Sequence, residues 1–140
     1  MPDCRRIIYG NYEKELEERL KPILSNLSIC GNVLVLGVEE FMYPALWFAK
    51  QLEDKGCSVH FHATTRSPIA VSEEKDYPLH CRFCMSSVNA PDRKTYLYNV
   101  TAYDHVFVFV EKNYATQVGM DELKEVLTAC GNHKIQFIAI

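Results

Sequence analysis

Two short clusters of polar and charged residues each follow an apolar run, and together they could bind an anionic, hydroxyl-bearing ligand. Glu39 and Glu40 come directly after a run that ends at Gly37. Arg66 follows the next apolar run, among hydroxyl groups and a proline: Thr64, Thr65, Ser67 and Pro68. The planar guanidinium of an arginine matches phosphate or carboxylate, and neighbouring hydroxyls complete such a site. Carboxylates accept hydrogen bonds from sugar hydroxyls or bind a divalent cation.

We therefore assign a phosphate to the cluster around Arg66, and sugar hydroxyls or a magnesium ion to the glutamates. Tyr43 and Tyr98 are expected to wall the pocket. If the protein is an enzyme, Glu39 or Glu40 is the expected general base, provided that burial raises its pKa toward working pH. No glycine-rich loop of the G-x-G-x-x-G or G-x-x-x-x-G-K-[ST] type is present to cradle the phosphate instead.

Both clusters also have simpler interpretations. Arg66 would be a solvated arginine in an ordinary polar turn. Glu39 and Glu40 would be favourable charges near a helix N-terminus, worth about 0.3–1 kcal/mol. Both interpretations stay open, and the positions of the clusters relative to the predicted strands favour the ligand-binding one.

Hydrophobic patterns predict an α/β fold. Apolar residues at spacings of three and four predict helices at about 12–27, from Pro44 to near Gly56, and before Gly131. Runs rich in β-branched and aromatic residues predict five strands, at about 33–37, 58–63, 95–100, 105–110 and 134–140. This order indicates a three-layer, Rossmann-like fold, with a mostly parallel sheet of about five strands and helices on both faces. Ligands of such sheets bind beyond the carboxyl ends of the strands, where both polar clusters fall.

The chain of 140 residues fits one domain, with an N-terminal helical segment over 1–31. Residues 64–93 show no period and contain three prolines, which predicts a long loop of functional importance. The formal charge of −3 argues against a duplex nucleic-acid binder. Neither a secretory signal nor a membrane-spanning run is apparent, so a cytoplasmic protein is expected. The apolar last strand could pair with a second copy to form a homo-oligomer.

A C-x-x-C pair, Cys81 and Cys84, offers a third type of chemistry. With His80 and the strand residues His60 and His62 it could bind zinc, if these side chains converged from different elements. A redox pair of the thioredoxin type would open a helix directly after a strand, and this one lies in a loop. We expect free thiols and no metal centre, with zinc as the alternative.

Three stretches of the sequence together resemble the TRSP domain family, which takes its name from a Thr-Arg-Ser-Pro motif. The matching residues lie at 36–43, at 64–69, and at 96–100 with Tyr103 and Asp104. Members of this family lie C-terminal to an orotate-phosphoribosyltransferase-like domain, in proteins of tellurite-resistance and stress gene clusters. The acidic pair followed by a Thr/Gly-rich loop that marks phosphoribosyltransferases themselves is absent here. The Cys81/Cys84 pair is not part of the family pattern.

The resemblance implies work beside a phosphoribosyltransferase on a nucleotide-like metabolite, rather than phosphoribosyl transfer by this chain. The favoured hypothesis is a domain that binds a phosphorylated sugar or nucleotide. The alternatives are a non-catalytic module that docks on the phosphoribosyltransferase, and a zinc-containing domain.

Overall fold

The computed structural model describes residues 2–27, 31–66 and 82–140, which form two compact units, Met1–Cys30 and Gly31–Ile140. The first unit contains one helix, α1 (Pro2–Asn26), with Pro22 inside it. It starts about ten residues earlier than the apolar pattern predicted. An exposed ion pair between Arg19 and Glu15, 2.9 Å apart, joins successive turns of α1.

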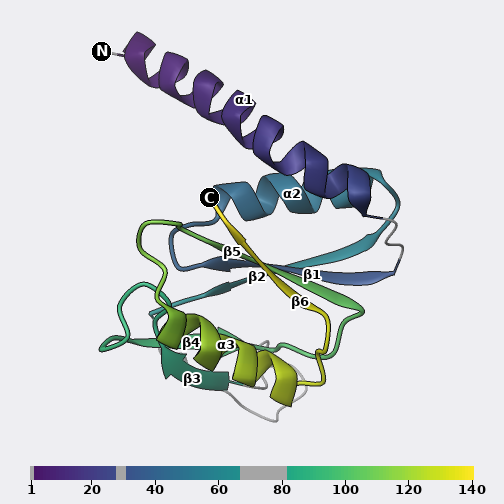
Figure 1. Cartoon of the computed structure of the whole chain (residues 1–140), viewed down its shortest axis with the longest axis vertical. Coiled ribbons are helices and arrows are strands. Elements are labelled where there is room, and N and C mark those ends of the chain that lie inside the picture. The colour runs from purple at the N-terminus through teal and green to yellow at the C-terminus, as the bar shows by residue number, and fades with distance from the viewer. Residues whose placement is uncertain (1, 28–30, 67–81) are drawn as a thin grey trace, which may run out of the picture. The chain divides into compact units, whose positions relative to one another are not determined.

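The second unit is built on a four-stranded parallel sheet in the order β2-β1-β5-β6 (Figure 1). The strands are β1 (Asn32–Val38), β2 (Ser58–Thr64), β5 (His105–Val110) and β6 (Ile135–Ala139). The chain leaves β1 toward β2 on one side, and β5 and β6 lie on the other. The strand order therefore reverses between β1 and β5, as in doubly wound folds. Both central strands are buried along their length, in agreement with their continuous apolar runs.

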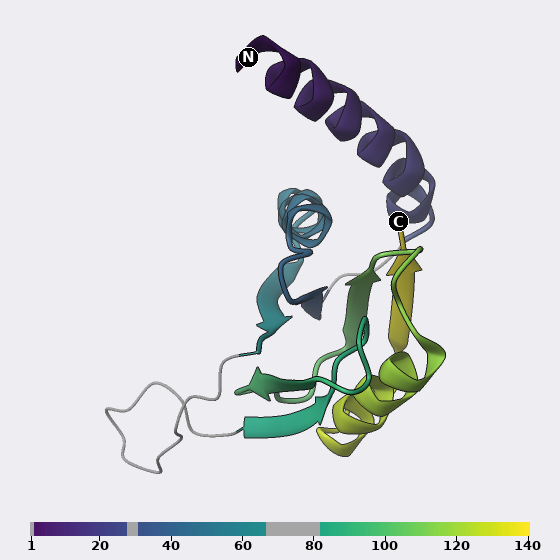
Figure 2. The same cartoon turned by 90° about the vertical axis from the view of Figure 1, so that its left-hand side faces the viewer.

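Helix α2 (Tyr43–Asp54) covers one face of the sheet (Figures 1 and 2). The ring of Phe48 packs between Phe107 and Phe109 of β5, with ring centroids 5.1 Å apart in both pairs. Pro44 lies in the first turn of α2, where its missing N–H costs no hydrogen bond.

The opposite face is covered by α3 (Gln117–Ala129) and by a hairpin of β3 (Arg82–Ser86) and β4 (Lys94–Tyr98). Along each strand of the sheet, the side chains that alternate with those facing α2 point to this opposite face and form a core with α3 and the hairpin. Its buried members come from the sheet, the hairpin and α3: Leu34, Leu36, Val38, Met85, Val88, Leu97, Val100, Val106, Val108, Val110, Leu123 and Leu127. The three-layer α/β class predicted from the sequence is confirmed.

The main sheet has four strands rather than about five. The segment expected at 95–100 instead forms β4, which pairs antiparallel with β3 in a separate sheet. The expected loop over 64–93 contains β3. Both strands bury only part of their residues, Met85 in β3 and Thr95, Leu97 and Tyr98 in β4, as strands with one covered face do. A bridge between Thr65 and Tyr96 joins the end of β2 to β4.

Candidate functional site

A cavity of about 380 Å³ lies at the carboxyl ends of β1 and β2, where the sequence predicted the ligand site. Its described lining consists of Glu39, Glu40, Met42, Ala63, Thr64, Thr65 and Arg66. The turn after β1 is tight at this point. A Cβ on Gly37 would lie 3.1 Å from the carbonyl oxygen of Phe41, so a larger residue would have to displace that backbone.

Glu39 is buried and has a left-handed backbone, with φ of 54°. A non-glycine residue in this region is uncommon and persists where its surroundings hold it. Two acceptors on Thr64 hold the Glu39 N–H: the carbonyl oxygen and Oγ1, both at 3.1 Å. The end of β1 is thus fixed to the end of β2, and the Glu39 side chain is directed away from the regular strand.

The Glu39 carboxylate is paired with Arg93, which lies 54 residues later, between β3 and β4. Arg93 donates from Nε to Oε1 at 3.1 Å and from Nη2 to Oε2 at 2.5 Å. Ser87, fully buried, donates its hydroxyl to the same Oε1 at 3.3 Å. The Glu39 side chain is 3% exposed and that of Arg93 37%, so a buried carboxylate is held in fork geometry by a partly exposed guanidinium.

Glu40 has a different partner and forms an exposed ion pair with Arg66, at 2.5 Å between Oε1 and Nη2. The hydrogen bond from Arg66 lowers the pKa of the Glu40 carboxyl, with a smaller contribution from the charge of Arg93. Glu40 in turn raises the pKa of Arg66. A general base near neutral pH needs a raised carboxyl pKa, so Glu40 does not meet that condition. Arg66 does stand at the cavity, with a carboxylate as its present partner.

The N-terminal turn of α3 fixes the segment that carries Ser87 and Arg93. Thr116 donates to the carbonyl oxygen of Val88 from its backbone N–H at 2.8 Å and from its hydroxyl at 2.7 Å. The same hydroxyl accepts the N–H of Gly119 at 3.2 Å and so caps the helix. Gly119 packs so closely that a Cβ there would lie 2.5 Å from the Cα of Val88. The backbone behind Arg93 is therefore anchored to α3.

The structure brings together part of the predicted site. Thr64 is buried against Glu39, while Thr65 uses its backbone to pair with Tyr96. Tyr43 is 48% exposed at the start of α2, and Tyr98 is buried at the end of β4; neither is among the described residues that line the cavity. Ser67 and Pro68 lie outside the described residues.

Arg93 and Ser87 were missed by the sequence reasoning. Both lie in the segment expected as a loop, and no local motif marks either of them. Their importance comes from a contact across more than forty residues of chain, which periodicity cannot detect.

The proposed zinc ligands are only partly covered by the structure. Cys81 and His80 lie outside the described residues, and Cys84 is an exposed free thiol on β3. His62 is half-buried; burial lowers its pKa, as does the charge of His60 two residues earlier on the same face of β2. Across residues 2–27, 31–66 and 82–140, no group of three or more His, Cys, Asp or Glu side chains is placed to hold a metal ion.

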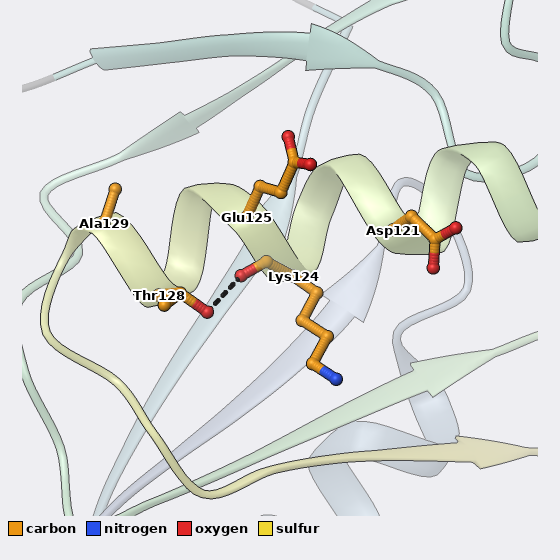
Figure 3. A pocket seen from close by; sticks show the side chains of 5 residues that line it. All are labelled: Asp121, Lys124, Glu125, Thr128 and Ala129. Atoms are coloured by element: carbon orange, nitrogen blue, oxygen red, sulfur yellow. Dashed lines mark hydrogen bonds between the residues drawn. The ribbon is translucent and has the colours of Figure 1, made fainter.

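A larger hollow, of about 600 Å³, lies along α3 (Figure 3). Its described lining comes from this helix alone: Asp121, Lys124, Glu125, Thr128 and Ala129. The Thr128 hydroxyl is already bonded to the Lys124 carbonyl oxygen at 2.7 Å. These lining groups carry mixed charge and lie away from the carboxyl ends of the strands, so we place the candidate site at the smaller cavity.

The fold and the site are those of an α/β domain with a cavity beyond its parallel strands. The chain belongs to the TRSP domain family, whose model, described as the TRSP domain C-terminal to PRTase_2, matches residues 8–128. Its role is therefore associated with a phosphoribosyltransferase-like domain. No curated protein and no solved structure matches the chain. None of the described helices is long and apolar enough to cross a membrane.

Proposed function

We propose that this domain binds a phosphorylated sugar or nucleotide-like metabolite that a phosphoribosyltransferase partner makes or uses. The observation that carries the proposal is the cavity at the ends of β1 and β2, with Arg66 and Glu39 both among its lining residues. A volume of about 380 Å³ is within the range of small-ligand sites, roughly 300–1,000 Å³.

The roles follow from the charges. Arg66 and the Thr65 hydroxyl would take the phosphate, and Glu39 would accept a sugar hydroxyl. Because an anionic ligand competes with Glu40 for Arg66, Glu40 would swing toward solvent on binding. Glu40, released from Arg66, would be the residue to hold a magnesium ion, which would neutralise charge on the phosphate.

The biological setting is inferred from the association of the family with a phosphoribosyltransferase-like domain. We place the binding step in the biosynthesis of a nucleotide-like metabolite, in a stress or tellurite-resistance context, beside the phosphoribosyltransferase domain.

A calorimetric titration with ribose 5-phosphate and AMP would test the proposal. Arg66→Ala should abolish binding, because it removes the main cation of the cavity. Arg19→Ala is the matched control: Arg19 is also an exposed, carboxylate-paired arginine, 52% exposed against 51%, but it lies on α1. Absence of binding to the unsubstituted protein, or equal binding by Arg66→Ala, would refute the assignment.

A second candidate function is docking on the phosphoribosyltransferase domain without catalysis. It is favoured by three exposed apolar side chains at the start of α2: Met42 (38%), Tyr43 (48%) and Leu46 (48%). Met42 also lines the cavity. Leu46→Glu should weaken binding of a family phosphoribosyltransferase domain added in solution, whereas Val118→Glu, 64% exposed on α3, should not. Equal binding by both variants would count against this surface.

A further inference from the structure

The carboxylate of Glu39 is nearly saturated with hydrogen bonds. A carboxylate offers about four lone-pair positions. Two on Oε1 are taken by Arg93 Nε and Ser87 Oγ, and one on Oε2 by Arg93 Nη2. One position, on Oε2, is left by these contacts. Glu39 is among the residues that line the cavity, and its side chain is 3% exposed. A ligand hydroxyl that reaches the carboxylate would therefore meet a single acceptor position.

The Ser87 hydroxyl has little freedom to do anything else. Its oxygen accepts from the backbone N–H groups of Asn89 and Ala90 and from Arg93 Nη2, each at 3.3 Å. Its own hydrogen is therefore directed to Glu39. The Ser87 N–H also donates to the Arg93 carbonyl oxygen at 2.8 Å, which closes the loop between β3 and β4. Arg93 and Ser87 thus hold the carboxylate from one rigid loop.

We propose that Arg93 is a positioning residue of the cavity: its guanidinium fork holds Glu39 so that one carboxylate oxygen accepts a hydroxyl of the bound sugar phosphate. The proposal rests on the proposed function and deepens it. Arg93 is absent from the described cavity lining, so it acts through Glu39 and not on the ligand's phosphate. Hydroxyl recognition and phosphate recognition are therefore separable, the first depending on Arg93 and the second on Arg66.

The test compares two probes, ribose 5-phosphate and inorganic phosphate, in calorimetric titrations of the full chain. Arg93→Lys keeps the positive charge but cannot donate two parallel bonds to the carboxylate. We expect it to weaken ribose 5-phosphate binding about tenfold or more, the usual effect of losing a hydrogen bond to a charged group. Inorganic phosphate needs no hydroxyl acceptor, so its affinity for Arg93→Lys should stay within about twofold of its affinity for the unsubstituted protein.

Two further variants serve as a substitute test and as a control for effects of changing any arginine of the hairpin. Ser87→Ala removes one hydrogen bond to Glu39 and leaves the guanidinium fork in place, so it should weaken ribose 5-phosphate binding less than Arg93→Lys does. It provides the test if Arg93→Lys fails to fold. Arg82→Lys, on the exposed side of the same hairpin, should change neither affinity.

The outcomes separate the two proposals. Equal weakening of both probes by Arg93→Lys would show a general structural role and overturn the inference, as would no change in either. If the unsubstituted protein binds inorganic phosphate and ribose 5-phosphate equally, hydroxyl recognition is absent and the inference falls, while Arg66 keeps its anion role. If it binds neither probe, the proposed function itself fails.

Discussion

Replacing Gly119 by alanine should destabilise the protein, although the same change in an open helix would be neutral or favourable. Alanine is better than glycine in a helix by at most about 1 kcal/mol. Here the added Cβ would lie 2.5 Å from Val88 Cα, 2.7 Å from the Ser87 carbonyl oxygen and 2.9 Å from that of Val88. All three are backbone atoms, which cannot rotate away as a side chain would.

The size of the destabilisation follows from the backbone displacement that the added Cβ would require. Overpacking costs about 1–3 kcal/mol, and backbone collisions belong at the upper end. Displacing Val88 also strains its two hydrogen bonds with Thr116, each worth about 0.5–1.5 kcal/mol. After subtracting the helix gain, the net loss in the free energy of unfolding should be about 2–4 kcal/mol.

Urea unfolding followed by fluorescence of the single tryptophan, Trp47, measures this loss. With a slope of about 2 kcal/mol per molar urea, the midpoint should fall by about 1–2 M. Val118→Ala is the control in the same turn: it is 64% exposed and should change stability by no more than about 0.5 kcal/mol. A midpoint for Gly119→Ala equal to or above that of the unsubstituted protein would refute the packing argument.

Three further predictions test other contacts. Arg66→Ala should raise the pKa of the Glu40 carboxyl toward its ordinary 4.5 in an NMR titration, because the hydrogen bond that lowers it is lost; an unchanged value would mean the pair does not form in solution. His62→Gln should flatten the decline of the urea midpoint below pH 6.5. The folded-state pKa of His62 is lowered, so the contribution of neutral His62 to the free energy of unfolding is complete above the unfolded pKa of 6.5 and is lost as the pH falls toward the folded pKa. An unaltered dependence of the urea midpoint on pH in His62→Gln would contradict this. Asn132→Ala should cost about 2–4 kcal/mol, since Asn132 is fully buried and bonds Tyr103 N–H and the carbonyl oxygens of Thr101 and Leu127. The exposed Asn113→Ala is its control, and equal midpoints for the two would exclude the role.

The parallel sheet could be predicted because its two central strands are buried on both faces. The runs at β1 and β5 are apolar at almost every position, a pattern that few other elements share. The ends of β1 and β2 then placed Glu39, Glu40 and Arg66 at one edge without further information.

The hairpin could not be predicted in the same way. A strand was predicted at 95–100, where β4 lies, but neither β3 nor its antiparallel pairing with β4 was. β3 has five residues and one covered face, and alternation over so short a length is weak. Arg93 does lie in a loop, between β3 and β4, but its contact with Glu39 could not be predicted. The sequence contains no local sign that this arginine, rather than Arg66, pairs with Glu39. That choice is made by tertiary packing, through the anchoring of Val88 on α3.

The pairing of Glu39 with Arg93 also ties the site to the order in which the chain assembles. A fragment that stopped before residue 93 would contain the strands β1 and β2 but not the partner that orients the carboxylate at their end. The cavity is therefore completed by a late, chain-distant contact. Local opening of the hairpin should release Glu39 while the parallel sheet stays intact, because the strands of the two sheets pair separately and the bridge between Thr65 and Tyr96 lies beyond the end of β2. Amide exchange in β3 and β4 would then slow when a ligand binds to Glu39. Exchange in the hairpin would thus measure occupancy of the cavity, although no residue of the hairpin is among those described as lining it.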